Sequence, residues 1–369
     1  MTLGQSTNNV IEKEDDKGQI QQVSGAFGDS NAMDEQALQI AFTGEQRALA
    51  LALKYAPVSE EVWAESAQSL DYTMESQVFE YEILRQAPEF GMKQYNEAVY
   101  RGELLNGKRQ GLGVMQYRKA RVYEGQWQAD ARNGRGMERY SNGNRYEGEF
   151  VSGKPHGKGV YTWANGEVYE GEWALGLKEG QGIWKGIFGD SYIGEWRQSK
   201  ATGYGVHQWK NGDRYEGEWQ NCLKHGQGSD IFANGDCYSG TYTNGKPEGQ
   251  GQYKWKNGSI YIGEFKDGLK NGKGKWKKRF NDQNCNMYEG SYENDKKNGM
   301  GMFTWESGNY YKGCYKDDER HGYGEMYWKD GSCYKGEWNK GIQNGVGRME
   351  FPDGRIKEGL FENNTFKGP

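Results

Sequence analysis

Histidine is the side chain best suited to metal binding and to acid–base catalysis at neutral pH, and the chain of 369 residues contains only four. Three of them, His156, His225 and His321, each stand directly before a Gly-x-Gly triplet in widely separated segments. Ligands of one metal ion must converge, so the same place in distant segments does not form a site. The fourth, His207, lies near Trp209 with no evident nucleophile beside it. We expect neither a metal site nor histidine-based catalysis.

The cysteines and glycines do not form a metal-binding, redox or nucleotide-binding motif either. The five cysteines contain no C-x-x-C pair, and their odd number and wide spacing indicate reduced, free thiols. Gly-x-Gly triplets such as Gly180-Gln181-Gly182 belong neither to a dinucleotide-binding pattern nor to a phosphate-binding loop. The sequence therefore predicts that the protein is not an enzyme and has no catalytic, cofactor-binding or metal-binding residues. The cysteines are Cys222, Cys237, Cys285, Cys314 and Cys333.

The glycines and aromatic residues instead follow a tandem repeat of 23 residues. Each unit begins with a Tyr, has a Gly two residues later and usually an aromatic residue two further on, and carries a Gly-x-Gly triplet that starts eleven residues after the Tyr. Eleven units fill residues 100–356, the eighth with 27 residues, and a partial twelfth covers residues 357–369. The tyrosines that open the units are Tyr100, Tyr123, Tyr146, Tyr169, Tyr192, Tyr215, Tyr238, Tyr261, Tyr288, Tyr311 and Tyr334.

The spacing within a unit predicts a β-hairpin. Residues two apart share one face of a strand, so the Tyr, the Gly and the aromatic residue lie together, and the Gly leaves room for rings to pack over bare backbone. We expect the Gly-x-Gly triplet to open a second strand that carries another aromatic residue, such as Trp163 or Trp209. Pairs such as Asn142-Gly143 suit tight turns with positive φ and would join one unit to the next.

Stacked hairpins predict a mainly β protein: an elongated, single-layer antiparallel sheet whose stability is mostly a sum of nearest-neighbour contacts. With two strands per unit at about 4.8 Å each, eleven units would measure roughly 100 Å. The rings on the aromatic face would take the place of a core. Glutamates in the fourth position of a unit would point away from that face and pair loosely with Lys and Arg in solvent. They are Glu149, Glu172, Glu195, Glu218, Glu264 and Glu337.

The pattern Tyr-x-Gly-x-Trp followed by Gly-x-Gly, repeated over residues 100–356, resembles the MORN repeat family. This resemblance implies rows of β-hairpins in one sheet and a role that is mostly scaffolding. Members occur in ciliary radial spoke heads, junctional membrane complexes and parasite cytoskeletal rings, and as accessory regions of lipid kinases and a methyltransferase. No kinase or methyltransferase motif accompanies the repeats in this sequence.

The eighth unit contains a dense basic stretch. Four extra residues separate it from the ninth unit, and the loop of residues 281–287 should protrude at a bend or bulge. Two interpretations stay open: the stretch binds an anionic partner, either lipid headgroups or acidic protein tails, or it is a solvated strand edge that lysines keep from aggregating. Its residues are Lys266, Lys270, Lys273, Lys275, Lys277, Lys278 and Arg279.

The acidic head of the chain, ahead of the repeats, is predicted to be of a different class. Residues 1–33 are expected to form a disordered acidic tail, and residues 34–95 a small α-helical segment, with a helix start at Ser59 and an end before Pro88. An apolar stripe recurs there every three or four residues. It would either cap the open sheet edge or dock on a partner or a second copy. The docking face is Trp63, Leu70, Met74, Val78, Tyr81 and Leu84.

The charge distribution argues against nucleic acid as a partner. Residues 1–95 hold 6 Lys and Arg against 16 Asp and Glu, while the remainder holds 41 against 36. This nearly neutral body lacks the basic character of a nucleic-acid binder. No stretch approaches the roughly 20 apolar residues that span a bilayer, and the polar, acidic N-terminus does not resemble a secretory signal.

We therefore expect a cytoplasmic, non-enzymatic scaffold that holds structural or cytoskeletal proteins, with the ciliary axoneme as the location that the resemblance favours. Two alternatives stay open: a peripheral membrane protein whose repeats bind anionic phospholipids, and a targeting subunit for a separate enzyme. Self-association through a sheet edge or the N-terminal helices is a further expectation.

Overall fold

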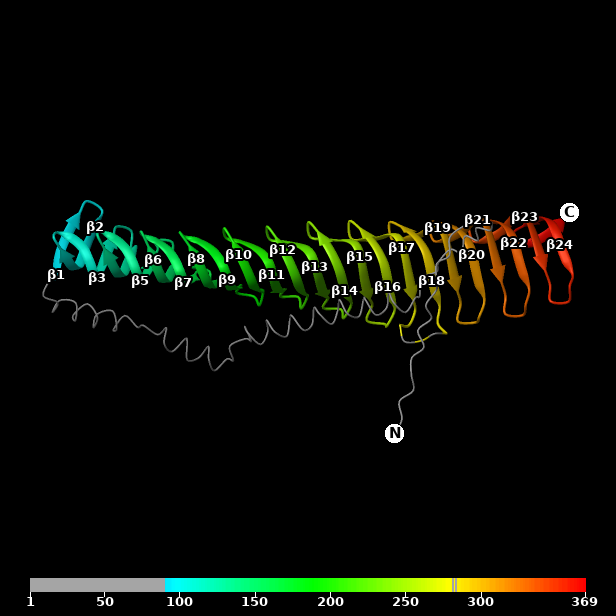
Figure 1. The fold of residues 1–369 in the computed structure, drawn as a ribbon, viewed down its shortest axis with the longest axis horizontal. Coiled ribbons are helices and arrows are strands. Elements are labelled where there is room, and N and C mark those ends of the chain that lie inside the picture. Colours follow the sequence, from blue (N-terminus) through cyan, green and yellow to red (C-terminus); the bar gives the residue numbers. More distant parts are fainter. Residues whose placement is uncertain (1–89, 281, 283) are drawn as a thin grey trace, which may run out of the picture. The chain divides into compact units, whose positions relative to one another are not determined.

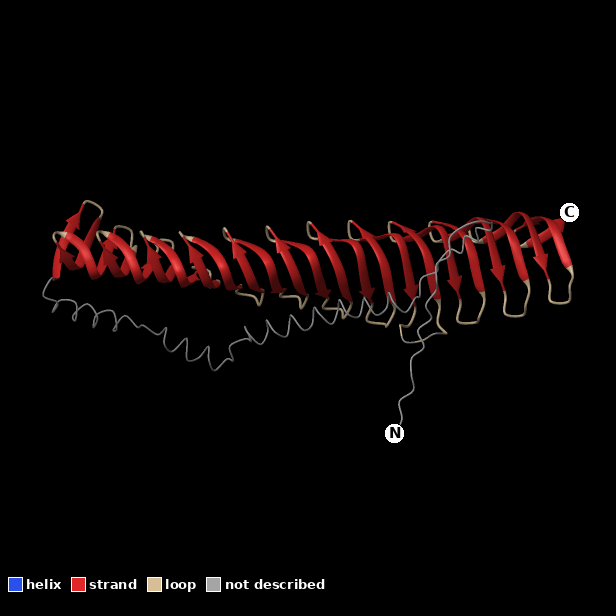
Figure 2. Cartoon of the chain, viewed as in Figure 1, coloured by secondary structure: helices blue, strands red, loops and turns tan. Residues whose placement is uncertain are grey.

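The computed structural model describes residues 90–369 apart from 281 and 283, and within this range it contains strands and no helix. Twenty-five strands form one sheet (Figures 1 and 2). Each strand pairs antiparallel with the strand before it and the strand after it in the chain, as β2–β3 and β3–β4 illustrate. The sheet is a single open layer, which confirms the predicted mainly β architecture of tandem hairpins.

The strands of the first six units and the strand that precedes them are β1 (Phe90–Tyr95), β2 (Ala98–Leu105), β3 (Lys108–Tyr117), β4 (Val122–Gln128), β5 (Ala131–Arg139), β6 (Arg145–Val151), β7 (Lys154–Thr162), β8 (Val168–Ala174), β9 (Leu177–Lys185), β10 (Ser191–Arg197), β11 (Lys200–Gln208), β12 (Arg214–Gln220) and β13 (Leu223–Ile231). The remaining strands are β14 (Cys237–Thr243), β15 (Lys246–Lys254), β16 (Ile260–Lys266), β17 (Leu269–Lys277), β18 (Met287–Glu293), β19 (Lys296–Thr304), β20 (Tyr310–Lys316), β21 (Glu319–Tyr327), β22 (Cys333–Asn339), β23 (Ile342–Glu350), β24 (Ile356–Glu362) and β25 (Thr365–Gly368).

Two kinds of turn connect the strands. Inside a unit, both residues of a two-residue loop have positive φ, as at Asn106 (50°) and Gly107 (73°), which is the hairpin geometry that matches strand twist. Between units, only the Gly of a pair such as Asn142-Gly143 has positive φ (87°), and its N–H donates to the Tyr140 carbonyl at 3.0 Å. The predicted Asn-Gly turns between units are therefore confirmed, with the glycine alone in the left-handed region. Between the first and second units, where no such pair occurs, Lys119 (61°) and Ala120 (58°) both have positive φ.

The sequence predicted that the Gly-x-Gly triplet opens the second strand. In the structure the triplet lies inside that strand instead. In the first unit β3 begins at Lys108, three residues before Gly111. Strand pairing starts directly after the two-residue turn, with Leu105 opposite Lys108 and Leu104 opposite Arg109, and then shifts so that Gly102 faces Gly113. Gly111, at φ 58°, takes up the extra residues as a β-bulge. The triplet is needed for this bulge rather than for the start of the strand.

The tyrosines that open the units form the core of the sheet. All eleven are buried, with exposed fractions of 3% or less. Each hydroxyl donates to the main-chain carbonyl three residues further on, at 2.8–3.2 Å. A Cβ at Gly113 would overlap the ring and hydroxyl of Tyr100, and every unit repeats this close approach in kind. The prediction that bare backbone makes room for the rings is confirmed.

Edge-to-face ring contacts join each unit to the next without interruption. Positions are counted here from the opening tyrosine as position one. Each tyrosine contacts the aromatic residue in position five of the following unit and, where one is present, the aromatic residue in position five of its own unit. The ring centroids are 5.0–5.4 Å apart, from Tyr100 to Phe361. This is the preferred geometry of aromatic pairs. Where position five is Trp, its indole N–H donates to the carbonyl of the second glycine in the Gly-x-Gly triplet of the preceding unit, as Trp127 does to the Gly113 carbonyl at 3.1 Å. The interfaces between units are thus all built alike.

The two ends of the sheet differ from the prediction in one respect. Residues 90–95, the last six of the segment expected to be helical, form β1, whose backbone pairs with β2 from Phe90 opposite Glu103 to Tyr95 opposite Ala98. The boundary at residue 95 was therefore wrong, because pairing with the first hairpin extends the sheet by one strand. At the other end β24 and β25 form the partial twelfth unit, and Phe361 is buried against Tyr334. Residues 1–33 and the docking face from Trp63 to Leu84 lie outside the described residues.

Candidate interaction surfaces

A row of cations lies on the aromatic face. In seven of the eleven units, position ten is Lys or Arg, and its charged group stands over the rings of the face. Lys178 Nζ is 4.4 Å from the ring centroid of Trp196 and 5.0 Å from that of Tyr169. Burial lowers the pKa of Lys178 and of Lys270. The seven are Arg109, Arg132, Lys178, Lys224, Lys270, Lys297 and Arg320.

These cations are arranged for packing rather than for chemistry. Cation–π contacts of this kind stabilise the sheet by about 1 kcal/mol or somewhat more when desolvated. These cations were not among the sites predicted from the sequence, although a basic residue that recurs nine residues after the tyrosine is a signal that identifies them. Because they alternate with buried rings, the aromatic face carries positive charge beneath its surface.

Two buried carboxylates neutralise part of this charge. Asp230, 5% exposed, accepts from Lys224 Nζ at 2.5 and 2.7 Å and from the Tyr242 hydroxyl at 2.6 Å. Glu138, 1% exposed, lies between Arg121 and Arg132, with N–O distances of 2.5 Å to each. A buried pair of this kind is costly to break, since the remaining charge would lack a partner.

The rim of the aromatic face carries a second row of rings in position eighteen. They are half-buried, and all except Phe351 pack against the core, so they are a part of this face that another molecule can reach. His207 belongs to this region: its ring stacks on Trp209 with centroids 4.2 Å apart, and burial lowers its pKa. The row comprises Tyr117, Tyr140, Trp163, Trp209, Phe232, Trp255, Trp305, Trp328 and Phe351.

The residues considered first for chemistry stay apart. His156 accepts from the Leu175 N–H at 3.4 Å and so braces the turn of the next unit. Among the residues that the structure describes, no three His, Cys, Asp or Glu side chains gather where they could hold a metal ion. All five cysteines are free thiols.

The glutamates of position four have a different role from the one expected. They do point away from the aromatic face, but instead of pairing loosely with Lys and Arg, five of the six, all but Glu337, accept a hydrogen bond from the backbone. Glu264 Oε1 accepts from the Lys273 N–H at 3.1 Å, and Glu149 and Glu218 make the same bond at 3.3 and 3.1 Å. This N–H belongs to the middle residue of the Gly-x-Gly triplet. The bulge turns it away from the backbone hydrogen bonds between the strands.

The basic stretch of the eighth unit is divided between the two faces of the sheet. Alternation along β17 puts Lys273, Lys275 and Lys277 on the face opposite the rings, together with Lys266 of β16. Lys275 forms an ion pair with Glu289 at 3.5 Å. Lys270 lies on the aromatic face instead, with its Nζ 5.3 Å from the Tyr292 ring centroid.

The end of the stretch lies beyond β17. Arg279 forms ion pairs with Asp282 at 2.9 Å and with Glu306 at 2.8 Å. The Lys278 N–H donates to the Asn286 carbonyl at 2.9 Å, which closes the longer loop of this unit. Of the seven predicted residues, the structure therefore brings four together on one face, and local carboxylates already offset part of their charge.

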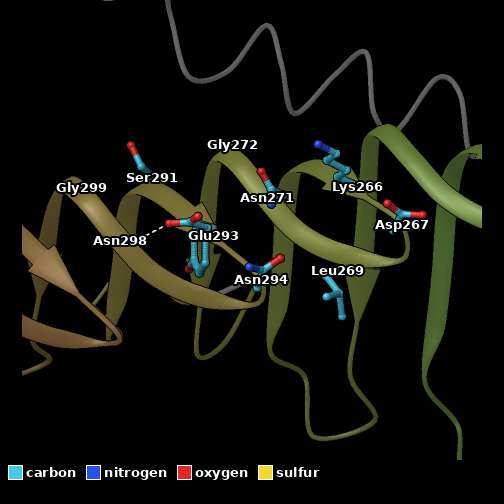
Figure 3. Close-up of a pocket in the computed structure, with 11 residues that line it drawn as sticks. Lys266, Asp267, Leu269, Asn271, Gly272, Ser291, Glu293, Asn294, Asn298 and Gly299 are labelled. Atoms are coloured by element: carbon cyan, nitrogen blue, oxygen red, sulfur yellow. Dashed lines mark hydrogen bonds between the residues drawn. The ribbon is translucent and has the colours of Figure 1, made fainter.

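A hollow of roughly 760 Å³ lies beside this stretch (Figure 3). Strands β16 to β19 and their turns form it, between the eighth and ninth units. Lys266, Asn271 and Ser291 point to the same side in Figure 3. Its lining is mostly polar and consists of Lys266, Asp267, Leu269, Asn271, Gly272, Ser291, Tyr292, Glu293, Asn294, Asn298 and Gly299.

No helix long and apolar enough to cross a membrane occurs in the part of the chain that the structure describes.

Comparison with known families gives one match that covers more than half of the chain. The model described as MORN repeat matches eleven segments: residues 100–119, 123–145, 146–168, 169–186, 192–214, 215–237, 238–260, 261–278, 288–310, 311–333 and 334–354. These segments begin at the eleven repeat tyrosines. No curated protein matches.

The solved structures that match this chain have low sequence identity and low TM-scores. The TCP10 domain of Danio rerio CPAP is 13% identical, with a TM-score of 0.31, over 61% of this chain and 99% of that one. The TCP domain of Drosophila melanogaster SAS-4, solved with a proline-rich motif of Ana2, is 13% identical, with a TM-score of 0.27, over 43% of this chain and 85% of that one. Scores this low support no conclusion about function.

Proposed function

The chain belongs to the MORN repeat family, and from this premise we propose that it is a non-enzymatic scaffold that holds partner proteins in a cytoskeletal assembly. The observation that carries the proposal is the uninterrupted array: the contact between rings is repeated from Tyr100 to Phe361 without a break. Such an array presents two long faces at fixed spacing. One carries half-buried rings above buried cations, and the other carries charged side chains of both signs, such as Lys275 and Glu289.

An axonemal location of the radial-spoke type is the specific form of this proposal. It is supported by the resemblance to the MORN repeat family, members of which occur in ciliary radial spoke heads. A sheet built from identical steps suits an assembly in which partners sit at repeating intervals, because neighbouring units differ in their surface residues while their backbone spacing stays constant.

Purification of the tagged full-length protein from its native cells, followed by mass spectrometry, tests the scaffold proposal. A version without residues 1–89 is the matched comparison; it retains β1 and therefore the whole described sheet. We expect axonemal or other cytoskeletal proteins to be recovered with the full chain, and those bound through the sheet to remain with the shorter one. Recovery of membrane components alone would refute the scaffold proposal.

Binding of anionic phospholipids is the second candidate, and one observation favours it. Lys266, Lys273, Lys275 and Lys277 share one face of two adjacent strands. Each basic residue near an anionic surface contributes roughly 1 kcal/mol, but the ion pair of Lys275 with Glu289 reduces this.

Substitution of Lys273, Lys275, Lys277, Lys278 and Arg279 by Gln separates the two candidates. If the membrane carries the function, the variant should lose binding to phosphatidylserine vesicles in a sedimentation assay, while Lys178→Gln, on the other face, should bind as the parent does. Equal sedimentation of parent and variant, or none by the parent, would exclude lipid binding through this stretch.

A further inference from the structure

In part of the array, the side chain at position four of the repeat accepts a hydrogen bond from the backbone. In the first six units and the eighth, a Glu or Gln side chain accepts from the backbone N–H in the middle of the Gly-x-Gly triplet, at 2.7–3.3 Å. The bulge turns this N–H away from the neighbouring strand, so a side-chain oxygen takes the place of a carbonyl. The acceptors are Glu103, Gln126, Glu149, Glu172, Glu195, Glu218 and Glu264.

The ninth unit keeps the bulge but not the acceptor. Its position four is Ser291, and the register shift between Gly290 and Tyr292 matches the one between Gly263 and Phe265 in the eighth unit. A Cβ on Gly299 would meet Ser291 Cβ at 3.4 Å, whereas one on Gly272 would collide with the Glu264 carboxylate. Among the described residues no side chain accepts from the Met300 N–H. A serine is too short to reach it.

The space that the missing carboxylate leaves coincides with the hollow in Figure 3. Ser291 and Gly299 both line it. Lys273 approaches from the next strand and donates to Ser291 Oγ at 2.9 Å. The Ser291 hydroxyl, the Asn271 amide and the Lys266 amine line this space. Lys273 Nζ adjoins it through its bond to Ser291 Oγ. The Met300 N–H directly follows Gly299, where the eighth unit holds a carboxylate.

We propose that this hollow receives the carboxylate of an Asp or Glu side chain from a partner protein. The partner's group would take the position that Glu264 fills in the neighbouring unit, with the Met300 N–H and Lys273 Nζ as donors. This assignment rests on the proposed scaffold function and specifies the chemistry of one partner: an acidic segment with apolar residues. Met300, 52% exposed, and Tyr323, 57% exposed, lie on the same face and would contact those apolar residues.

The charges around the hollow favour a carboxylate over a phosphate group. Asp267 and Glu293 both line it, and a group with two negative charges would be repelled more strongly than one with a single charge. A carboxylate also has the planar oxygen pair that the same backbone geometry accepts in the eighth unit. A charge-assisted hydrogen bond is about twice as strong as a neutral one, so loss of the acceptor site should be measurable.

The Ser291→Glu variant tests the proposal, because its own carboxylate would fill the hollow. The probe is a fluorescein-labelled peptide of alternating Glu and Leu, measured by fluorescence anisotropy against the full-length protein. We expect at least about tenfold weaker binding by Ser291→Glu and several-fold weaker binding by Lys273→Gln. The same peptide with Gln in place of Glu should bind weakly to all of them.

Thr241→Glu is the matched control: the seventh unit also lacks a position-four carboxylate, but Gln227 rather than a lysine donates to its Thr241 Oγ1, at 3.0 Å, and Thr241 does not line the hollow. It should bind the peptide as the parent does. Equal binding by the parent and Ser291→Glu, or no binding by the parent, would overturn the proposal. Competition by inorganic phosphate at lower concentration than by acetate would also overturn it, in favour of a phosphate site.

The outcome is distinguishable from failure of the scaffold function. If the parent retains cytoskeletal partners in cells and Ser291→Glu retains every one of them, the hollow is not their binding site but the scaffold function stands. If the parent retains none, the scaffold function itself fails, whatever the peptide does. Circular dichroism and thermal melting of Ser291→Glu confirm that the variant is folded.

Discussion

At the scale of single residues, the repeat tyrosine determines most of what the other positions must be. Its hydroxyl needs an acceptor and finds the carbonyl of position four, as Tyr215 does at 2.9 Å from Glu218. Its ring needs space and lies on Gly228. Because desolvation disfavours the charged phenolate, burial raises the pKa of Tyr334 to about 12 and raises those of the other ten as well. These groups stay protonated while the sheet is folded.

This burial predicts a loss of stability in alkaline solution. A group whose pKa is higher in the folded state contributes stability that is present below its unfolded pKa, near 10, and that is lost as the pH rises above that value. Above pH 10, each of the eleven tyrosines should lower the free energy of unfolding by about 1.4 kcal/mol per pH unit. We expect the urea midpoint to fall steeply above pH 10, and phenolate absorbance to appear together with unfolding. Titration of these tyrosines in the folded protein near pH 10 would contradict their burial.

At the scale of strands and units, buried charge is the feature that distinguishes otherwise identical hairpins. Lys224 and Lys178 hold the same position in the sixth and fourth units, and both stand over three rings. Only Lys224 has a buried carboxylate partner, Asp230, at 2.5 Å. Burial and the Asp230 charge raise the pKa of Tyr242 above its ordinary value. The sixth unit therefore depends on its cation more than the fourth does.

Replacement of the two lysines by Met should separate packing from charge. Lys224→Met leaves Asp230 buried without its cation, and we expect a loss of about 3–5 kcal/mol in the free energy of unfolding. Lys178→Met removes a desolvated charge and its cation–π contacts together, so we expect a change of about 1 kcal/mol or less. Urea denaturation of both variants measures the difference, and equal losses would show that Asp230 does not need Lys224.

At the scale of the whole sheet, each unit contacts only its two neighbours. The rings of the fifth unit meet Trp219 of the sixth, and Trp196 meets Tyr169 of the fourth. The stability of such an array is close to a sum over units and interfaces. A unit that is removed whole lets its neighbours form the same kind of contact with each other.

Deletion of residues 192–214, one complete unit, should therefore leave a folded protein. We expect a thermal midpoint within a few degrees of the parent, since one unit and one interface among many are lost. Deletion of residues 192–203 is the control: it removes one strand and the first part of the next, so it breaks the alternation of faces and should unfold the sheet locally. Similar melting of the two deletions would argue against independent units.

The amino-acid sequence by itself determined the period, the hairpins, the aromatic face and the glycines beneath the rings, because these depend on spacing along the strand and repeat every 23 residues. It predicted the basic stretch of the eighth unit but not its division between two faces. The bulge at the Gly-x-Gly triplet decides that Lys270 lies over rings and that Glu264 accepts from the backbone.

Only the tertiary structure showed the hollow at Ser291, because it arises from a missing contact across two strands of one hairpin. A serine in that position looks ordinary in the sequence. Its meaning depends on the distance that the bulge sets between position four and the Met300 N–H, and strand alternation alone does not give that distance. Contacts that follow from period and face were readable in the sequence, while those that depend on the exact path of a bulged backbone required the folded chain.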